Sequence, residues 1–216
     1  MKAGVIVFPG TNCDRDTKGA CEFFGWDAEY VWHDETSLDK YDVVFLPGGF
    51  SYGDYIRAGR LARFSPVMQA VNDYVEKQRG FVVGICNGFQ ILCESKLLPG
   101  ILSVNWNTKF ICDITPLEMK INGNTKKINL PIAHGEGRFV ASEETIKEIE
   151  EKDMIFLKYS DNPNGSMDDI AGLYDKQKRV IGMMPHPERA VFKETTGTDG
   201  LQFFNMLELN LKQGMN

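Results

Sequence analysis

A cysteine lies in a sequence that favours nucleophilic chemistry. Residues 84–88 are Gly-Ile-Cys-Asn-Gly, between the apolar run Phe81–Ile85 and a helix pattern that includes Phe89–Cys93. A glycine on each side is typical of the sharp strand-to-helix turn that presents the nucleophile of α/β-hydrolases. Such a turn places the Cys86 sulfur at a helix N-terminus, where the helix dipole and free N–H groups favour the thiolate. The alternative is a small core cysteine in a tight turn, which is common for free cysteines.

A histidine and a glutamate two residues apart are the expected partners of Cys86. The chain has three histidines, and His186 lies in the segment Pro185-His186-Pro187-Glu188, just after an apolar run. A following proline favours extended backbone at His186, and side chains two residues apart on extended backbone point the same way. Glu188 would then orient the imidazole of His186, which would serve Cys86 as base and acid. Without Cys86, the same segment would be an ordinary rigid surface turn with a solvated carboxylate.

Hydrolysis at a carbonyl group also needs hydrogen-bond donors for the oxygen that becomes negative. The N–H of Asn87, directly after the cysteine, is one expected donor by analogy with hydrolase turns. Gly49 is the expected second donor, because Pro47-Gly48-Gly49 follows another apolar run, Val43–Leu46. Each such donor contributes about 3 kcal/mol of transition-state stabilisation. On spacing alone, an ordinary turn is the simpler interpretation of the two glycines.

Apolar segments that alternate with helix patterns position these residues. Strands are expected over Ala3–Phe8, Val43–Leu46, Phe81–Ile85, Met154–Tyr159, Ile170–Tyr174 and Val180–Met184. Helices are expected from Asn12 or Asp14 to Phe24, from Ser65-Pro66 towards Gly80, over Phe89–Cys93, from Ser142 onwards and over Asp199–Leu211. Continuous apolar strands separated by helices indicate a mostly parallel sheet that is covered on both faces.

The middle of the chain has a different pattern. Short alternating runs between Thr108 and Phe139, with a turn at Asn122-Gly123-Asn124, predict antiparallel hairpin strands. No repeat, low-complexity tract or linker divides the sequence. We therefore expect one α/β domain over residues 1–216, with a small antiparallel insertion in a mostly parallel sheet.

The composition excludes several classes of protein. The 216 residues carry 24 Lys and Arg against 30 Asp and Glu, a net charge of −6, and 43% are hydrophobic. That hydrophobic share excludes general disorder. The acidic balance argues against nucleic acid or an anionic membrane as a partner. Five cysteines without metal-ligand spacing, and no secretory signal, indicate free thiols in a cytoplasmic protein without a metal site.

Together these motifs resemble those of the triad-type, or class I, glutamine amidotransferases. The matching segments are Pro47-Gly48-Gly49, Gly84-Ile85-Cys86-Asn87-Gly88-Phe89-Gln90 and Pro185-His186-Pro187-Glu188, in that order, and they span nearly the whole chain. Within the family, the chain is similar to the small glutaminase subunits that serve purine biosynthesis. That similarity rests on the segments Phe8–Asp14, Pro47–Tyr55 and Ala133–Arg138. The family resemblance implies a three-layer flavodoxin-like fold made of one amidotransferase domain.

The resemblance also implies a reaction and partners. Cys86 would attack the side-chain amide carbon of L-glutamine, and His186 would protonate the departing ammonia and then activate water. In the family, the residue that matches Gln90 and the backbone around Gly135 hold the α-amino and carboxylate groups of glutamine. The chain has no phosphate-binding loop of the G-x-x-x-x-G-K-[ST] type. The resemblance therefore implies that ATP and Mg²⁺ belong to a separate large synthase subunit, accompanied by a small accessory subunit, and that this chain carries no cofactor.

Some features remain open at the level of sequence. Arg57, Arg60 and Arg63 are three residues apart, so a helix there would form either a solvated charged face or a stripe for docking or anion binding. His134, in a glycine-rich segment, receives no role. The alternative functions are a glutaminase for another synthase, a cysteine hydrolase of the DJ-1/PfpI type, and a non-catalytic scaffold subunit. In the DJ-1/PfpI type a histidine follows the cysteine directly, whereas here Asn87 does.

Overall fold

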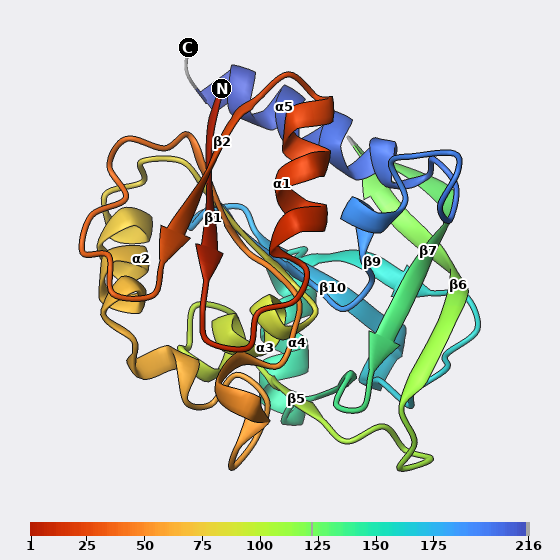
Figure 1. Cartoon of the computed structure of the whole chain (residues 1–216). Helices are drawn as coiled ribbons and strands as arrows, with labels where there is room; N and C mark the ends of the chain where they lie inside the picture. Colours follow the sequence, from red (N-terminus) through yellow and green to blue (C-terminus); the bar gives the residue numbers. More distant parts are fainter. Residues whose placement is uncertain (122, 215–216) are drawn as a thin grey trace.

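A nine-stranded sheet forms the centre of the protein in the computed structural model, which describes residues 1–121 and 123–214 (Figure 1). The strand order is β2-β1-β3-β4-β11-β10-β9-β6-β7. The first five strands in that order are parallel. Their bounds are Asp27–Trp32 for β2, Lys2–Val7 for β1, Val43–Leu46 for β3, Phe81–Ile85 for β4 and Val180–Met183 for β11.

The remaining four strands extend the sheet with antiparallel pairs. They are β10 (Ile170–Asp175), β9 (Ile155–Tyr159), β6 (Ile111–Ile121) and β7 (Asn124–His134). The long β6–β7 hairpin forms the edge of the sheet opposite β2 (Figure 1). It is joined to the central sheet through β9, so it continues that sheet. A separate two-stranded sheet pairs β5 (Ile101–Ser103) with β8 (Arg138–Val140).

Helices cover both faces of the parallel strands. They are α1 (Asp14–Phe23), α2 (Pro66–Glu76), α3 (Asn87–Glu94) and α5 (Gly200–Gly214). The remaining helix, α4 (Glu143–Glu151), directly precedes β9 in the antiparallel part of the sheet. On one face, Phe24 after α1 and Phe45 of β3 both stack on Phe204 of α5. On the other face, α3 packs so closely that its Gly88 meets the backbone of Leu46. Since neighbouring strand residues point to opposite faces, these contacts confirm the three-layer α/β fold.

Local chemistry accounts for several helix starts. Ser65 is extended and Pro66 follows as the first residue of α2, where its missing N–H costs nothing. Ser142 caps α4, because its hydroxyl accepts a hydrogen bond from the N–H of Thr145. The N-cap of α1 is Cys13, so the expected cap by Asn12 or Asp14 is wrong.

The sequence analysis differs from the structure in two further respects. The segment from Arg57 to Leu61 is not helical, because Ile56 and Gly59 both have positive φ angles; only the short turn Ala62–Phe64 follows. Strands β2 and β5 were not predicted from the sequence, because β2 contains charged residues and β5 is only three residues long. The first residue of the expected turn at Asn122-Gly123-Asn124 lies outside the described residues.

No helix in the described ranges is long and apolar enough to cross a membrane.

Candidate active site

Cys86 occupies a sharp turn between β4 and α3. Its φ of 51° and ψ of −105° are rare for a residue with a side chain, and its N–H donates to the carbonyl of Met183 at 2.7 Å. A Cβ atom at Gly84 would lie 2.6 Å from the backbone of Gly88, and one at Gly88 would overlap the backbone of Leu46, so both positions require glycine. The expected strand–turn–helix is confirmed, and strained backbone of this kind is concentrated at functional sites.

The sheet brings the other predicted segments to the same edge. Leu46 of β3 pairs with Gly84, and Ile85 pairs with Met183 of β11. Because the three strands are parallel, the segments that follow them all emerge at their carboxyl ends, where α/β sheets bind ligands. Consequently Gly48, Cys86 and His186 are neighbours: a Cβ on Gly48 would lie 2.7 Å from the His186 ring and 3.4 Å from Cys86 Cβ.

His186 and Glu188 form a buried pair. His186 Nδ1 lies 2.6 Å from Glu188 Oε1, and the two residues are only 1% and 2% exposed. The N–H of His186 donates to the carbonyl of Pro131 at 2.8 Å, which fixes the segment against β7. The expected pairing is present, although Glu188 lies in the short 3₁₀ turn Pro187–Arg189 and not on extended backbone.

The charge balance at His186 favours the imidazolium. Burial by itself would lower the pKa of His186, but the carboxylate of Glu188 and the sulfur of Cys86 outweigh it and hold this pKa well above 6.5. The ring faces the sulfurs of Cys86 and Cys13, and its Nε2 atom is buried without a hydrogen-bond partner among the described residues. His186 can therefore exchange a proton with a group in front of Cys86.

A cavity of about 170 Å³ opens at Cys86. Its wall includes Gly49, Gln90 and Gly135, all predicted from the sequence. Gly49 adopts a φ of +147°, and within the described part of the chain its N–H makes no hydrogen bond. The N–H of Asn87 belongs to the first turn of α3, where helices leave N–H groups unpaired. Both expected oxyanion donors are thus close to the cysteine.

Two of the predicted residues hold the site together through their side chains. Asn87 accepts from the N–H of Ser51 at 3.1 Å and donates to Gln90 Oε1 at 2.9 Å and to Asp54 at 3.2 Å. Gln90 in turn donates to the carbonyl of Glu136 at 2.6 Å. An amide nitrogen has two hydrogens, so Gln90 keeps one for a ligand in the cavity.

Sequence reasoning missed three polar residues of the cavity wall, namely Asp54, His134 and Glu136. Burial, together with the nearby charge of Glu136, raises the pKa of Asp54 to about 6. Burial and the charge of His186 lower the pKa of His134 to about 4, so this imidazole is neutral at pH 7. Asp54, His134 and Glu136 lie inside the motifs that carried the resemblance, but nothing in their spacing indicates that they meet.

The three arginines do not form a helical stripe. Arg57 and Arg60 both form ion pairs with the buried carboxylate of Glu94, and Arg63 donates to the Glu94 carbonyl at 3.2 Å. The expected helical face is therefore wrong, because the arginines anchor an irregular loop to the end of α3. A role of these arginines in docking or anion binding stays a prediction.

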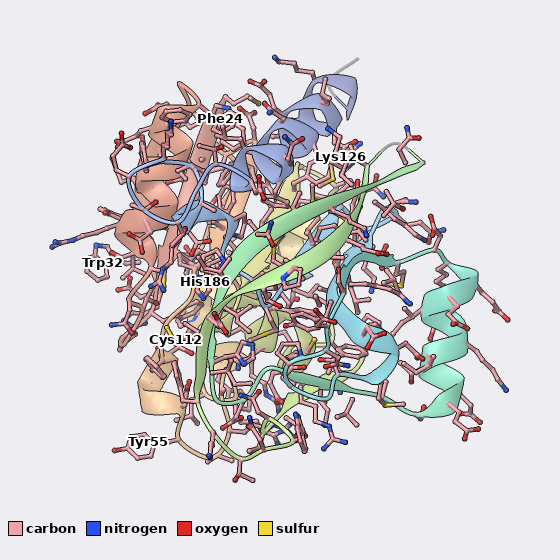
Figure 2. The ribbon with its side chains drawn as sticks, turned by 90° about the vertical axis from the view of Figure 1, so that its right-hand side faces the viewer. Phe24, Trp32, Tyr55, Cys112, Lys126 and His186 are labelled. Atoms are coloured by element: carbon pink, nitrogen blue, oxygen red, sulfur yellow. The ribbon has the colours of Figure 1, made fainter. Side chains whose placement is uncertain are left out.

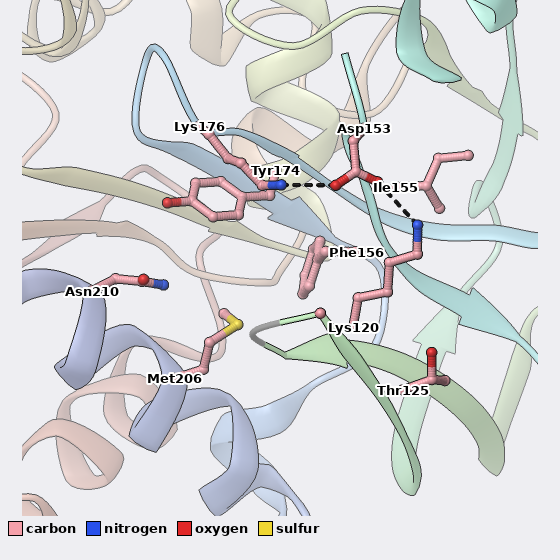
Figure 3. Close-up of a pocket in the computed structure, with 10 residues that line it drawn as sticks. Lys120, Thr125, Asp153, Ile155, Phe156, Tyr174, Lys176, Met206 and Asn210 are labelled. Carbon is pink, nitrogen blue, oxygen red and sulfur yellow. Dashed lines mark hydrogen bonds and ion pairs between the residues drawn. The ribbon is translucent and has the colours of Figure 1, made fainter. Parts of the chain in front are cut away.

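A larger hollow of about 430 Å³ lies between the β6–β7 hairpin, β9, β10 and α5 (Figure 3). Its charged groups are paired with one another, since Lys120 and Lys176 both bind Asp153, at 3.0 and 2.8 Å (Figure 3). Its described lining residues include no cysteine and no histidine. The smaller cavity is therefore the candidate active site.

Comparisons with known proteins agree with this geometry. Residues 1–199 match the CobB/CobQ-like glutamine amidotransferase domain. The chain is 50% identical to the phosphoribosylformylglycinamidine synthase subunit PurQ of a Nostoc species, over 96% of both chains. It is 48% identical to the PurQ of Prochlorococcus marinus, over 97% of this chain and 100% of that one. The solved structure of PurLQS from Thermotoga maritima matches with a TM-score of 0.88 and 40% identity, over 97% of this chain and 98% of that one.

Proposed function

The chain belongs to the family of CobB/CobQ-like glutamine amidotransferases, and we propose that it hydrolyses glutamine at the site formed by Cys86, His186 and Glu188. The protein is the glutaminase subunit of a phosphoribosylformylglycinamidine synthase, an enzyme of purine biosynthesis. It hydrolyses L-glutamine to glutamate and ammonia. The synthase uses the ammonia to convert formylglycinamide ribonucleotide (FGAR) to the amidine (FGAM).

The observation that carries the chemistry is the group formed by Cys86, His186 and Glu188. Cys86 attacks the amide carbon as the thiolate, because its proton is already held by the His186 imidazolium, and the N–H groups of Gly49 and Asn87 stabilise the oxygen that becomes negative. The imidazolium then protonates the departing ammonia and leaves a γ-glutamyl thioester on Cys86. His186 next activates a water molecule, which releases glutamate. Glu188 supports both steps, because it holds the ring through Nδ1 and leaves Nε2 towards the reacting groups.

The ATP-dependent step belongs to the partner. A large synthase subunit, PurL, holds ATP and Mg²⁺, the small accessory subunit PurS completes the complex, and this chain needs no cofactor or metal for amide hydrolysis. The five cysteines are free, four of them buried, which is typical of proteins of a reducing compartment. We place the reaction in the cytoplasm on that ground.

An assay of the assembled complex tests the proposal. Glutaminase activity should be low in the isolated chain and should rise on addition of the synthase subunits. Cys86→Ala should abolish FGAM formation from glutamine, whereas ammonium salt at alkaline pH should still support it. Loss of the ammonia-dependent reaction in an intact Cys86→Ala complex would contradict the proposed division of labour.

A further inference from the structure

A second cysteine lies against the imidazole of His186. Cys13 is 3% exposed, and its sulfur, a ring nitrogen of His186 and a carboxylate oxygen of Glu188 all lie within 4.8 Å of one another. Residue 48 is a glycine, and a Cβ atom there would lie 2.7 Å from Cε1 of the ring and 3.1 Å from the sulfur of Cys13. The missing side chain therefore leaves the space in which the sulfur and the ring meet.

The backbone holds Cys13 in this place. The N–H groups of Asn12 and Cys13 both donate to the carbonyl of Gly48, at 3.2 and 3.0 Å. Cys13 is also the N-cap residue of α1, but its side chain makes no capping hydrogen bond. Serine, threonine, asparagine and aspartate are the preferred residues at an N-cap. The cysteine at this position therefore contributes no capping bond to the helix, and its sulfur faces the active site instead.

A guanidinium group makes this sulfur an acceptor. Arg189 Nη2 lies 3.1 Å from Cys13 Sγ, and Arg189 Nε donates to Asp16 Oδ2 at 3.1 Å. Arginine has donors only, so the sulfur of Cys13 accepts. Asp16 belongs to the first turn of α1, so both partners of Arg189 come from the same end of one helix. The sulfur thus presents electron density to its surroundings, which include the imidazole of His186.

His186 loses one of its negative neighbours during the reaction. Burial lowers the pKa of His186, whereas Glu188, Cys86 and Cys13 each raise it. Once Cys86 has formed the thioester its sulfur is neutral, so of these three neighbours only Glu188 and Cys13 still stabilise the imidazolium. In the hydrolysis that follows, water adds to the thioester carbon and His186 takes its proton. The carbon–sulfur bond then breaks, and the sulfur of Cys86 leaves with the electron pair.

We propose that Cys13 is a positioning residue for the second half of the reaction, where it stabilises the imidazolium of His186 while Cys86 is acylated. The inference rests on the proposed function and adds to it a residue outside the group of Cys86, His186 and Glu188. In the first half the imidazolium gives its proton to ammonia, so an acceptor beside the ring does not speed that transfer. Loss of the Cys13 sulfur should therefore slow thioester hydrolysis but not thioester formation.

The test measures the γ-glutamyl thioester on Cys86 in the assembled synthase complex. Complexes that turn over glutamine are quenched in acid, and intact mass spectrometry gives the fraction of chains that carry the thioester. Cys13→Ala should slow thioester hydrolysis by about 10-fold, the lower end for a hydrogen bond to a charged group, because sulfur is a weak acceptor. The acylated fraction should therefore rise above that of the wild type. A role in packing alone would slow both steps alike and leave this fraction unchanged.

Controls separate the possible failures. Cys93→Ala removes another buried sulfur, from α3, and should leave the acylated fraction unchanged. If Cys13→Ala fails to fold, as judged by its thermal transition, Cys13→Ser decides. Serine is a preferred N-cap that turns its hydroxyl to the helix and away from the ring, so the fraction should rise there too. An acylated fraction at or below that of the wild type in a folded Cys13 variant would overturn the role of Cys13. A wild-type complex that hydrolyses no glutamine would instead contradict the proposed function.

Discussion

The five thiols of this chain have very different surroundings. Burial raises the pKa of Cys21 to about 12, and it raises that of Cys93 further. Cys13 is buried beside Arg189, whose Nη2 lies 3.1 Å from the sulfur. Cys112 is exposed, in strand β6. Only Cys86 combines a cavity, a helix N-terminus and a buried histidine.

These differences predict an order of labelling that depends on the reagent. A diazo-ketone analogue of glutamine should modify Cys86 first, and glutamine should protect it, because the analogue must occupy the cavity. A small general alkylating agent should also modify Cys112, because this thiol is exposed. Peptide mass spectrometry after timed quenching measures both rates. Equal labelling of Cys13, Cys21 or Cys93 by the diazo-ketone would contradict the assignment of Cys86.

Glu188 should affect the rate and its pH dependence but not substrate binding. Glu188→Gln keeps an acceptor for Nδ1 but removes the negative charge that raises the pKa of His186. The pKa should therefore fall, so the imidazolium is lost at a lower pH and the alkaline limb of the kcat profile moves to lower pH. We expect kcat to fall by about 10²- to 10⁴-fold, the range of general acid–base catalysis, with little change in the KM for glutamine. Full kcat with an unshifted profile would show that the carboxylate is only structural.

At the scale of elements, two helical glycines differ in how much space their surroundings leave for a side chain. A Cβ at Gly88 in the first turn of α3 would overlap the carbonyl oxygen of Leu46, whereas a Cβ at Gly19 in α1 would meet nothing within 4 Å. Gly88→Ala should lower the free energy of unfolding by about 2 to 3 kcal/mol through overpacking. Gly19→Ala should raise it by about 0.5 to 1 kcal/mol, because alanine favours the helix.

Urea unfolding monitored by circular dichroism measures both changes. Gly88→Ala should also abolish labelling by the diazo-ketone, because the turn that presents Cys86 cannot keep its shape. An unfolding free energy equal to that of the wild type in Gly88→Ala would contradict the close packing of α3 on β3.

The strands that were predicted well from the sequence are those made of an uninterrupted run of apolar residues. Strands β3, β4 and β11 are buried along their whole length, so each appears in the sequence as an unbroken apolar run between turn residues. The turn at Cys86 was predictable for a related reason, since Gly84 is required by a contact only four residues away, with the backbone of Gly88. Strand β2 alternates buried and exposed positions and contains charges, so its pattern is weaker.

Contacts between distant segments explain what the sequence did not predict. Arg57 and Arg60 meet Glu94 more than thirty residues later, and a spacing of three residues suggested a helix instead. Asp54 and Glu136 approach each other only because the loop after β3 and the loop after β7 reach the same cavity. Helical spacing says nothing about such contacts, because they depend on the positions of whole elements.

At the scale of the molecule, exposed apolar side chains gather around the cavity. Phe50 and Phe110 line the cavity and remain half exposed. Along the loop that starts at Phe50, Tyr55 and Ile56 are 73% and 83% exposed, and Figure 2 shows Tyr55 projecting from the body of the protein. His186 lies in the interior in the same view. Apolar surface of this extent usually marks a site of protein interaction, and the synthase must receive ammonia from this cavity.

We therefore expect the synthase subunit to cover Tyr55 and Ile56. Tyr55→Asp and Ile56→Asp should each weaken assembly by about 10-fold or more, because a charge would replace an apolar contact. Leu209→Asp is the matched control, since Leu209 is an exposed apolar residue on α5, which lies at the other end of the molecule from this loop (Figure 1). Calorimetric titration of the synthase subunits measures the affinities, and the rate of Cys86 labelling in the isolated chain should be the same in all three variants. Equal weakening by Leu209→Asp, or full affinity of both loop variants, would place the contact elsewhere on the protein.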